Sequence, residues 1–311
     1  MAKSILPEAR FHDEEAARKQ LEALRWPNGA ECPHCGGTER NVLLQGKATR
    51  PGLYFCGDCR TQFTVTVGTV FERSKVPLNK WLLVTHLMCA SKKSISAKQI
   101  ERMVGVTYKT AWFMCHRVRE AMRPMGFDKL GSGGGIVDAD ETYFGTSKKA
   151  LEDQKRRNKK LTSGHHKMKI VSLVDRGGNV RSFHVEKVTG LVLRDKLTTH
   201  IDKSAHLMTD EAPMYKVTGR HFASHEKVDH SQYEYVRGLA TTNTVESFFA
   251  LVKRSLVGTY HHVGEQHMVR YMNEFDFRYN HRKVTDSERA DAALIGIGGK
   301  RLQYRDSSTP G

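Results

Sequence analysis

Two pairs of cysteines constrain the fold of this chain more than any other feature of its sequence. Cys32 and Cys35 form one CxxC pair, Cys56 and Cys59 form the other, and 20 residues separate the pairs. Thiolates two residues apart in a tight turn can both reach one tetrahedral ion, and this spacing is typical of a four-thiolate zinc ribbon. Since four protein ligands leave no open coordination position, we expect a structural Zn²⁺ in a module over residues 32–74.

Other interpretations of these cysteines are four unrelated free thiols or a redox pair. A redox CxxC pair is typical of a thioredoxin-like βαβ unit, and no such pattern surrounds either pair. Cys89 and Cys115 lie among apolar residues, which favours core thiols. Ahead of the first pair, residues 13–25 have the apolar spacing of a short helix. We expect this helix to lie in an N-terminal segment, residues 1–31, that packs onto the cysteine-containing module after it.

The surplus of positive charge indicates a polyanionic partner. The sequence holds 50 Lys and Arg against 34 Asp and Glu, a formal net charge of +16, and nucleic acid is the usual partner of so basic a chain. No apolar run is long enough to span a bilayer, and no secretory signal pattern opens the chain. We therefore expect a cytoplasmic protein that associates with the nucleoid through double-stranded DNA and has no membrane partner.

Residues 75–124 are predicted to form three amphipathic helices. The last two are separated by a short glycine-containing turn, and the final helix carries the basic residues Lys109, Arg117 and Arg119. This arrangement is typical of a helix-turn-helix module, whose later helix enters the major groove of DNA. A plain helical hairpin is the alternative. The basic surplus favours the DNA-binding interpretation, with these three side chains as candidate contacts.

The rest of the chain is predicted to be an α/β domain over residues 136–285, between a glycine-rich linker (125–135) and a weakly patterned tail (286–311). Strands are expected at residues 135–144, 170–174, 180–188, 206–209 and 225–236, and helices at 191–201, around 215, within 241–254 and at 264–282. The order β-β-β-α-β-α-β-α is typical of a ribonuclease H-like domain. The basic stretch 147–169 is expected to be a loop.

Three acidic residues occupy special positions in this order. Asp140 lies in the first expected strand, Asp210 follows the fourth, and Glu246 lies on the late helix. Carboxylates held together repel one another, and divalent cations relieve the repulsion. Two Mg²⁺ (or Mn²⁺) ions held by these residues could activate a nucleophile at phosphorus and stabilise the leaving oxygen.

The late helix itself has two interpretations. Lys253 lies two turns along the helix on the face of Glu246 and could contact a DNA phosphate. Taken alone, the helix is better explained as a surface helix with one Glu–Lys pair, because such pairs are common. The two upstream aspartates, each placed where a strand is expected to end, favour the catalytic interpretation instead.

Six motifs, taken together, are similar to those of one family. They are LRWPNG at residues 24–29 before the first cysteine pair, YKTAW at 108–112, DETY at 140–143, TDE at 209–211, NTVE at 243–246, and KR at 253–254 followed by GTYH at 258–261. Over residues 11–280 the chain resembles bacterial insertion-sequence transposases with an N-terminal zinc ribbon and a DDE domain, the ISXO-like group.

The resemblance implies a DDE triad of Asp140, Asp210 and Glu246, with Lys253 as the basic residue after the third carboxylate. Lys253 and Arg254 are expected to contact DNA. The resemblance also implies an enzyme that binds the terminal inverted repeats of an insertion sequence, cleaves DNA with metal help, and joins the exposed 3′-hydroxyl to target DNA.

Several neighbouring residues need separate expectations. Asp138 and Glu141 flank the first aspartate, and we expect both to point to the opposite face of the strand. Thr146 stands where the family usually has a second glycine, and the basic stretch behind it is atypical, so both departures concern the loop. Four histidines are candidates for hydrogen bonding or phosphate contact rather than metal ligation: His225, His230, His261 and His262.

Two other functions compete with transposition. A DNA-binding regulator that has lost catalysis would not need all three carboxylates and Lys253. A ribonuclease H-fold nuclease would not need a zinc ribbon and a helix-turn-helix for sequence-specific DNA. Because one chain offers a single site whereas two element ends must be joined to a target, we expect a homodimer or higher multimer on DNA.

Overall fold

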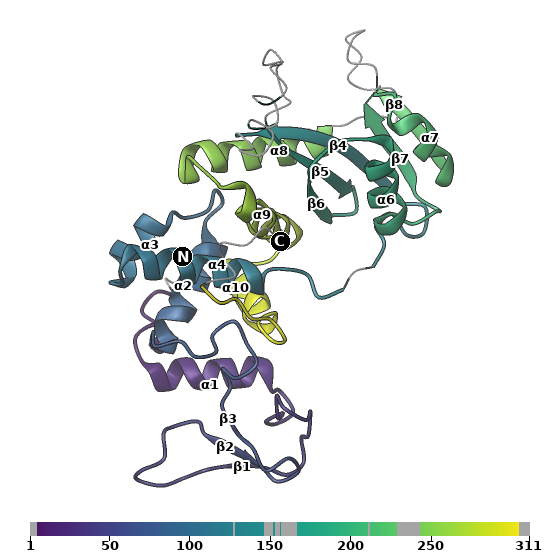
Figure 1. Cartoon of the computed structure of the whole chain (residues 1–311). Helices are drawn as coiled ribbons and strands as arrows, with labels where there is room; N and C mark the ends of the chain where they lie inside the picture. Colours follow the sequence, from purple (N-terminus) through teal and green to yellow (C-terminus); the bar gives the residue numbers. More distant parts are fainter. Residues whose placement is uncertain are drawn as a thin grey trace. The chain divides into compact units, whose positions relative to one another are not determined.

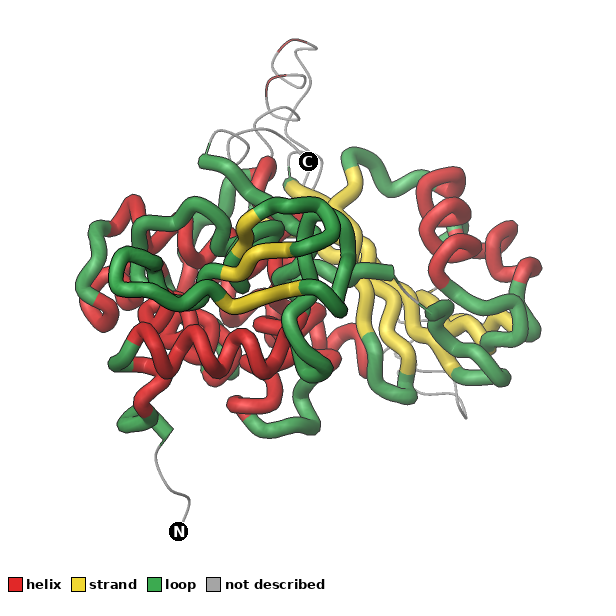
Figure 2. Tube along the Cα trace, turned by 90° about the horizontal axis from the view of Figure 1, so that it is seen from below, coloured by secondary structure: helices red, strands yellow, loops and turns green. Residues whose placement is uncertain are grey.

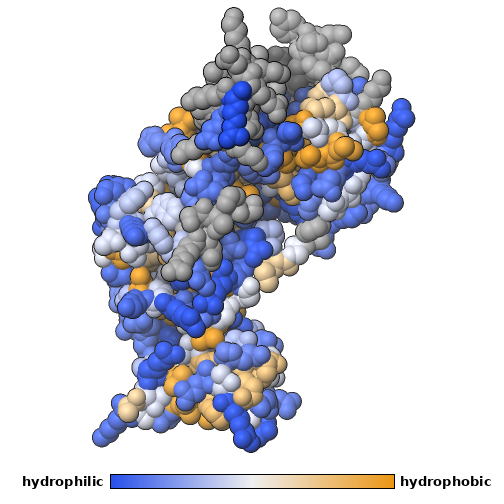
Figure 3. Space-filling view, in the orientation of Figure 1, coloured by the Kyte–Doolittle hydropathy of each residue, from blue (hydrophilic) through white to orange (hydrophobic). Residues whose placement is uncertain are grey.

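The computed structural model describes residues 5–126, 128–145, 152, 156, 167–210, 212–228 and 243–304. The chain divides into two compact units (Figure 1). Within the described residues, unit 1 takes in residues 5–123 and 284–304, and unit 2 takes in the residues between them. Hydrophilic residues cover most of the face drawn in Figure 3, in keeping with the net charge of +16. No helix in these described ranges is both long and apolar enough to cross a membrane.

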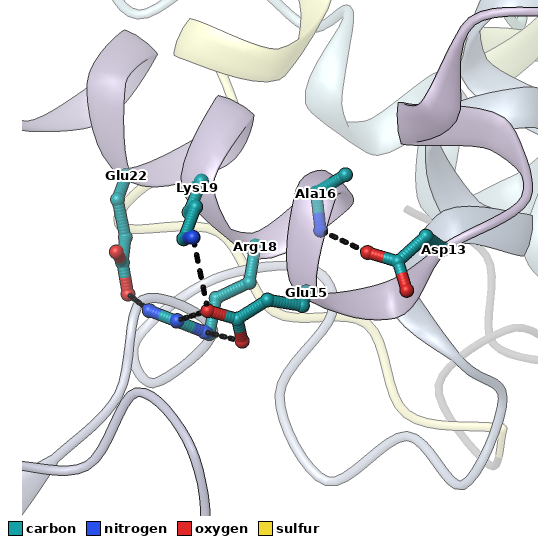
Figure 4. A network of polar contacts seen from close by, with 6 residues as sticks. All are labelled: Asp13, Glu15, Ala16, Arg18, Lys19 and Glu22. Atoms are coloured by element: carbon teal, nitrogen blue, oxygen red, sulfur yellow. Dashed lines mark hydrogen bonds and ion pairs between the residues drawn. The ribbon is translucent and has the colours of Figure 1, made fainter. Parts of the chain in front are cut away.

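Helix α1 (Glu14–Arg25) opens unit 1 after the short 3₁₀ turn η1. It begins at Asp13, whose carboxylate accepts a hydrogen bond of 2.6 Å from the backbone N–H three residues on. On its polar face, Arg18 donates to Glu15 and to Glu22, one turn to either side (Figure 4). Pairs of this kind add about 0.2–0.5 kcal/mol each to a helix, so capping and charge pairing both favour the helix where it is observed.

The cysteine-containing segment forms a small antiparallel sheet in the order β1-β2-β3. Its strands are β1 (Asn41–Leu43), β2 (Tyr54–Cys56) and β3 (Gln62–Phe63). Trp26, directly after α1, packs edge-on against Tyr54 and Phe63, with ring centroids 5.4 and 5.8 Å away. Gly52, at φ +73°, lies so close to Arg18 that a Cβ there would come within 2.3 Å of Arg18 Cδ. The first helix thus packs onto the ribbon, as expected.

Three helices follow the ribbon within unit 1. They are α2 (Leu78–Ala90), α3 (Ala97–Val104) and α4 (Tyr108–Ala121). Ser96 caps the start of α3 and Thr107 caps the start of α4. Between them, Gly105 ends α3 in the left-handed region at φ 65°, which glycine adopts without a steric penalty. Helices α3 and α4 contact each other and both contact α2.

The C-terminal segment differs from the weakly patterned tail that we expected. It forms helix α10 (Asp286–Ile295), which begins with a capping box between Thr285 and Glu288 and packs on α2. Arg289 donates to the backbone carbonyl of Cys89 at 2.8 Å, near the end of α2. The pattern was missed because α10 is short and is stabilised by contacts with α2 that lie far away in the sequence.

Lys300 extends this return of the chain into unit 1. Its side chain is only 2% exposed, and its ammonium donates to the carbonyl of Ala121 at 2.6 Å and to that of Arg123. A cation that binds the last carbonyls of a helix completes their hydrogen bonding and opposes the negative end of the helix dipole. The chain that follows α10 therefore closes the C-terminal end of α4.

Unit 2 is built on a five-stranded sheet in the order β6-β5-β4-β7-β8 (Figure 2). The strands are β4 (Ile136–Phe144), β5 (Met168–Asp175), β6 (Val180–Val185), β7 (His206–Asp210) and β8 (Ser224–Val228). β4, β5 and β6 pair antiparallel, whereas β7 and β8 run parallel to β4. The central position of β4 therefore puts β5 on one side of it and β7 on the other.

Helices cover both faces of this sheet. They are α6 (Gly190–His200), α7 (Tyr215–Thr218), α8 (Asn243–Ser255) and α9 (Met268–Asn280), with the short turns η2 (Gly219–His221), η4 (Leu256–Tyr260) and η5 (Glu265–His267). Apolar residues of α8 and α9 form one core with the sheet, and residues of α6 and α7 form a second core. The expected element order β-β-β-α-β-α-β-α is confirmed in the described residues.

The predicted linker 125–135 begins where unit 2 begins, and its glycine-rich part packs within unit 2. Gly131 donates to the carboxylate of Asp175 at 3.1 Å, and a Cβ on Gly131 would lie 2.6 Å from Ala205 and 2.8 Å from Val137. With φ +72°, this position needs a glycine for its backbone as well as for its contacts. The segment is a packed turn of unit 2. The predicted loop 147–169 lies mostly outside the described residues.

The free edge of β6 is covered by polar side chains of α9. Asn280 accepts a hydrogen bond of 2.7 Å from Val180 N–H and donates one of 3.1 Å to its carbonyl. Asp276 accepts from Ser182 N–H at 2.7 Å. These side chains satisfy the outward backbone groups of an edge strand, which would otherwise be open to pairing with another chain.

Candidate active site and metal centre

The four cysteine thiols of the ribbon lie at one point. Their sulfur atoms are all within 4.8 Å of one another, and the pairs Cys32–Cys59 and Cys35–Cys56 are each 3.6 Å apart. Zn–S bonds of about 2.3 Å in a tetrahedron place the sulfurs about 3.8 Å from one another. Hydrogen bonds from Thr61 lower the pKa of the Cys59 thiol to about 6, whereas the pKa of Cys35 is raised to about 12 by burial and the neighbouring thiols. Binding of a cation would release the protons of the remaining thiols. The donor set fits the expected zinc site.

The register of the sheet brings the two aspartates to adjacent strands. The parallel pairing of β4 with β7 runs from Ile136 and His206 to Asp138 and Met208. Asp140 and Asp210 each lie two residues past the last pair of this ladder. Since residues two apart along a strand share a face, both side chains are on the face of the sheet that carries Asp138 and Met208.

Both aspartates accept a hydrogen bond from the backbone that follows them. The N–H of Glu141 donates to Asp140 Oδ1 at 2.7 Å, and the N–H of Ala212 donates to Asp210 Oδ1 at 3.1 Å. Each bond fixes one oxygen of its carboxylate and so restricts the rotation of the side chain. This is the arrangement that orients a carboxylate before it binds a cation.

Glu246 lies in the first turn of α8, and its charge acts on Asp140. This helix packs on β4 and β5 through Val245, Phe248 and Phe249. The hydroxyl of Thr244 is hydrogen-bonded to Asp138, which ties the start of the helix to β4. Glu246 is solvent-exposed, as an open metal site on a surface requires.

The pKa of Asp140 reflects both its burial and the acidic side chains near it. Burial is the largest cause that raises its pKa to about 7, and the negative charges of Glu141, Asp210 and Glu246 raise it further. A carboxylate that resists ionisation in this way is stabilised by a bound divalent cation. Among the described residues, only the cysteines gather their ligand atoms within 4.8 Å. The carboxylate oxygens of Asp140, Asp210 and Glu246 are therefore not all within that distance of one another.

This raised pKa predicts a pH-dependent stability. The ordinary pKa of aspartate is 3.8 and that of folded Asp140 is about 7, so the folded state binds the proton more tightly. The contribution of Asp140 to the free energy of unfolding therefore falls as pH rises from 4 to 7. We expect the free energy of unfolding of Asp140→Asn, relative to that of wild type, to rise by about 2 kcal/mol from pH 5 to pH 8 when no Mg²⁺ or Mn²⁺ is added. Urea unfolding at the two pH values measures this.

The exposed Asp195 provides the control, since Asp195→Asn should follow the wild-type pH dependence. Burial also raises the pKa of Asp276 to about 7, but this residue is present in all three proteins, so its effect cancels from the comparison. A constant difference between Asp140→Asn and wild type across the pH range would contradict the prediction.

The expectation for Asp138 is wrong, whereas that for Glu141 agrees with the contacts. Asp138 lies two positions before Asp140 and therefore shares its face, where it meets Thr244 of α8. Glu141 points the other way and accepts a hydrogen bond of 2.6 Å from the hydroxyl of Tyr215 on α7. Side chains an odd number of positions apart along a strand point to opposite faces, and those an even number apart share a face. The prediction applied the first rule to Asp138, which is two positions from Asp140.

Asp138 is occupied by an ion pair. Its side chain is 0% exposed, and the guanidinium of Arg176 donates to it at 2.8 and 3.0 Å. Burial raises the pKa of Asp138, and the hydrogen bonds and charge of Arg176 oppose this rise. These contacts point to a structural role beside the site.

Breaking this pair should be costly. Asp138→Ala removes both acceptors of Arg176 and is expected to lower the free energy of unfolding by about 3 kcal/mol, at the low end of the range for buried pairs because Arg176 keeps some contact with water. Urea unfolding measures the loss, with Asp195→Ala as the matched surface change. A loss below about 1 kcal/mol would place the pair among ordinary surface ion pairs.

The four candidate histidines differ in position. His225 Nε2 is hydrogen-bonded to the hydroxyl of Thr209 at 2.9 Å, which joins β7 to β8 next to Asp210. His261 and His262 are exposed beyond η4, and His230 lies outside the described residues. One of the four thus contacts a neighbour of the candidate site.

The expected DNA contacts also separate into two groups. Lys109, Lys253 and Arg254 are exposed. Arg119 is only 2% exposed, and Arg117 donates to the carbonyl of Leu302 at 3.2 Å within unit 1. The prediction that Arg117 and Arg119 contact DNA therefore disagrees with the structure, because α4 packs on three other helices and these side chains face the packed side.

Sequence reasoning missed three residues that shape the site. Arg176 pairs with Asp138, Thr244 ties α8 to β4, and Tyr215 binds Glu141. No linear spacing marks these contacts, since each joins elements far apart in the chain. The only signal was chemical: an arginine in the hairpin turn and a tyrosine five residues after Asp210.

Comparisons with known proteins cover both units. Residues 133–280 match the model of the ISXO2-like transposase domain, and residues 12–62 match that of the transposase zinc-ribbon domain. The chain is also similar to an uncharacterized protein in transposable element ISH50 of Halobacterium salinarum. The two share 30% identity over 283 residues, which is 88% of this chain and 93% of that protein. The chain therefore belongs to the ISXO2-like DDE transposases of insertion sequences, which carry an N-terminal zinc ribbon.

Proposed function

We propose that the protein binds the terminal inverted repeats of its insertion sequence and catalyses metal-dependent DNA strand cleavage and strand transfer. The observation that carries this proposal is the meeting of Asp140 and Asp210 on adjacent strands, with the charge of Glu246 acting on Asp140. The sheet order and the alternation of helices support a ribonuclease H-like fold for unit 2, in which strand-end carboxylates serve phosphoryl chemistry.

Asp140, Asp210 and Glu246 would hold two Mg²⁺ or Mn²⁺ ions. Their donor set fits, because hard divalent cations prefer carboxylate oxygens and tolerate an open site completed by water and phosphate. When bound, such ions activate the attacking oxygen and stabilise the leaving oxygen in an in-line displacement at phosphorus. The protein residues orient these oxygens, and Lys253 and Arg254 lie further along α8 to contact DNA phosphates.

Unit 1 would recognise the element end. Its ribbon fits a structural Zn²⁺, and α3, the turn at Gly105 and α4 have the order of a helix-turn-helix. Lys109 is exposed on the first turn of α4, where such modules contact DNA. With a net charge of +16, we expect a protein that works on the nucleoid in the cytoplasm.

The test uses DNA that flanks the gene. A labelled duplex carrying the inverted repeat, incubated with the protein, Mg²⁺ and a target plasmid, should be cut at the element end and joined to the plasmid. A duplex with the repeat shuffled is the matched control. Binding without cleavage in Mg²⁺ or Mn²⁺ would favour a regulator, and equal cleavage of both duplexes would favour a nuclease.

The working species is proposed to be a homodimer or higher multimer assembled on DNA. Each chain offers one carboxylate site, whereas two ends must be held for joining. Highly basic chains repel one another until DNA phosphates neutralise them, so assembly should need DNA and weaken with salt. Light scattering with and without end DNA tests this. A complex of one chain and one end under conditions of strand transfer would refute it.

A further inference from the structure

The hydrogen bond between Tyr215 and Glu141 lies just beyond the end of a strand pairing. The ladder between β4 and β7 ends at Asp138 and Met208, two residues before Asp140 and Asp210. At the level of the two aspartates, the strands are therefore no longer joined to each other by that ladder. A separate contact is needed there to fix the distance between the carboxylates.

Tyr215 and Glu141 provide such a contact. Glu141 directly follows Asp140, and Tyr215 follows Asp210 by five positions. Their side chains meet at 2.6 Å on the face of the sheet opposite the carboxylates. Tyr215 is 0% exposed, packed in the core formed with α6, so its hydroxyl is held in place by the surrounding side chains.

The backbone transmits this contact to the aspartates. Glu141 also donates its N–H to Asp140 Oδ1, so fixing Glu141 fixes the orientation of that carboxylate. On the other strand, Ala212 N–H orients Asp210 in the same short segment that leads to Tyr215. The hydrogen bond between Tyr215 and Glu141 thereby connects the two chain segments whose backbone N–H groups orient Asp140 and Asp210.

We propose that Tyr215 and Glu141 are positioning residues that set the spacing of Asp140 and Asp210 for divalent cations. This inference rests on the proposed function, since it takes the two aspartates as metal ligands. Residues that hold metal ligands by hydrogen bonds typically change metal affinity by about 10- to 100-fold when they are replaced.

The test measures Mn²⁺ binding to the zinc-loaded, full-length protein by calorimetry. Tyr215→Phe removes only the hydroxyl and should weaken Mn²⁺ binding about tenfold. Glu141→Ala should also weaken it, through lost charge as well as lost positioning. In the double variant, Tyr215→Phe should then add less than about a twofold change, because its partner is already gone.

Tyr260→Phe is the matched control. It removes another tyrosine hydroxyl that donates to a buried glutamate of unit 2, Glu274, at 3.0 Å. It should cost similar stability and leave Mn²⁺ affinity at the wild-type value. Wild-type affinity in Tyr215→Phe, or an undiminished effect of Tyr215→Phe in the Glu141→Ala background, would overturn the proposal.

Hydrogen exchange separates this proposal from the proposed function. Without divalent metal, Tyr215→Phe should speed amide exchange in residues 139–144 and 207–215, whereas Tyr260→Phe should not. If wild type bound no Mn²⁺, or if Asp140→Ala bound it as tightly as wild type does, the proposed metal-dependent function would be contradicted. The positioning contact would then be judged by exchange alone, and unchanged exchange would overturn it.

Discussion

Replacing Asp140 or Asp210 by alanine is expected to lower metal-dependent cleavage of an element end by at least about 1,000-fold. Binding to the same DNA should stay within about twofold of wild type, because recognition is assigned to unit 1. Cleavage should be lost because each carboxylate would hold the cations that stabilise the charge developing at phosphorus during the reaction, whereas DNA binding does not depend on those cations. Cleavage of labelled end duplex and binding in a gel-shift titration measure the two effects.

Asp195→Ala is the control for these variants. It removes an exposed aspartate of the same unit and should cleave like wild type. Equal loss of cleavage and of DNA binding in Asp140→Ala would indicate misfolding instead of lost chemistry. Substantial Mg²⁺-dependent cleavage by either variant would remove that aspartate from the site.

Cys32→Ser or Cys59→Ser should release the metal and unfold the ribbon. Metal binding supplies much of the folding free energy in modules this small, with apparent values of about 10–16 kcal/mol for zinc-finger peptides. Loss of one thiolate leaves an incomplete tetrahedron, so binding of end DNA should weaken by at least about tenfold. Elemental analysis of zinc and a DNA titration measure both.

A cysteine outside the ribbon tests whether this effect is specific. Cys89 is buried on α2 and does not belong to the thiol cluster. Cys89→Ala should therefore keep the zinc. Wild-type protein purified without zinc would contradict the ribbon assignment, as would full end binding by Cys32→Ser.

The elements with strong local signals were predictable from sequence. The CxxC pairs, the element order and the end of β7 at Asp210 follow from spacing and apolar period, which act over a few residues, whereas Asp140 lies in the middle of β4 and not at its end. Glu246 was placed because its helix has one clear apolar stripe. These signals suffice to find the carboxylates but not the contacts between elements that orient them.

The errors concern information that is spread over distant segments. The apolar spacing of α4 could not show that its far side is also packed, so Arg119 was assigned to DNA although it is buried. The glycines before β4 resembled a linker because composition does not reveal that Gly131 touches Ala205. Asp138 could have been placed correctly, since the period of a strand already puts it on the face of Asp140.

The return of the chain from unit 2 to unit 1 imposes an order on synthesis. Helix α10 and Lys300 complete the ends of α2 and α4, yet the ribosome makes them after every described strand of unit 2. A nascent chain that has not reached α10 would therefore hold Asp140 and Asp210 in a finished sheet, while α2 and α4 of unit 1 still lack these contacts.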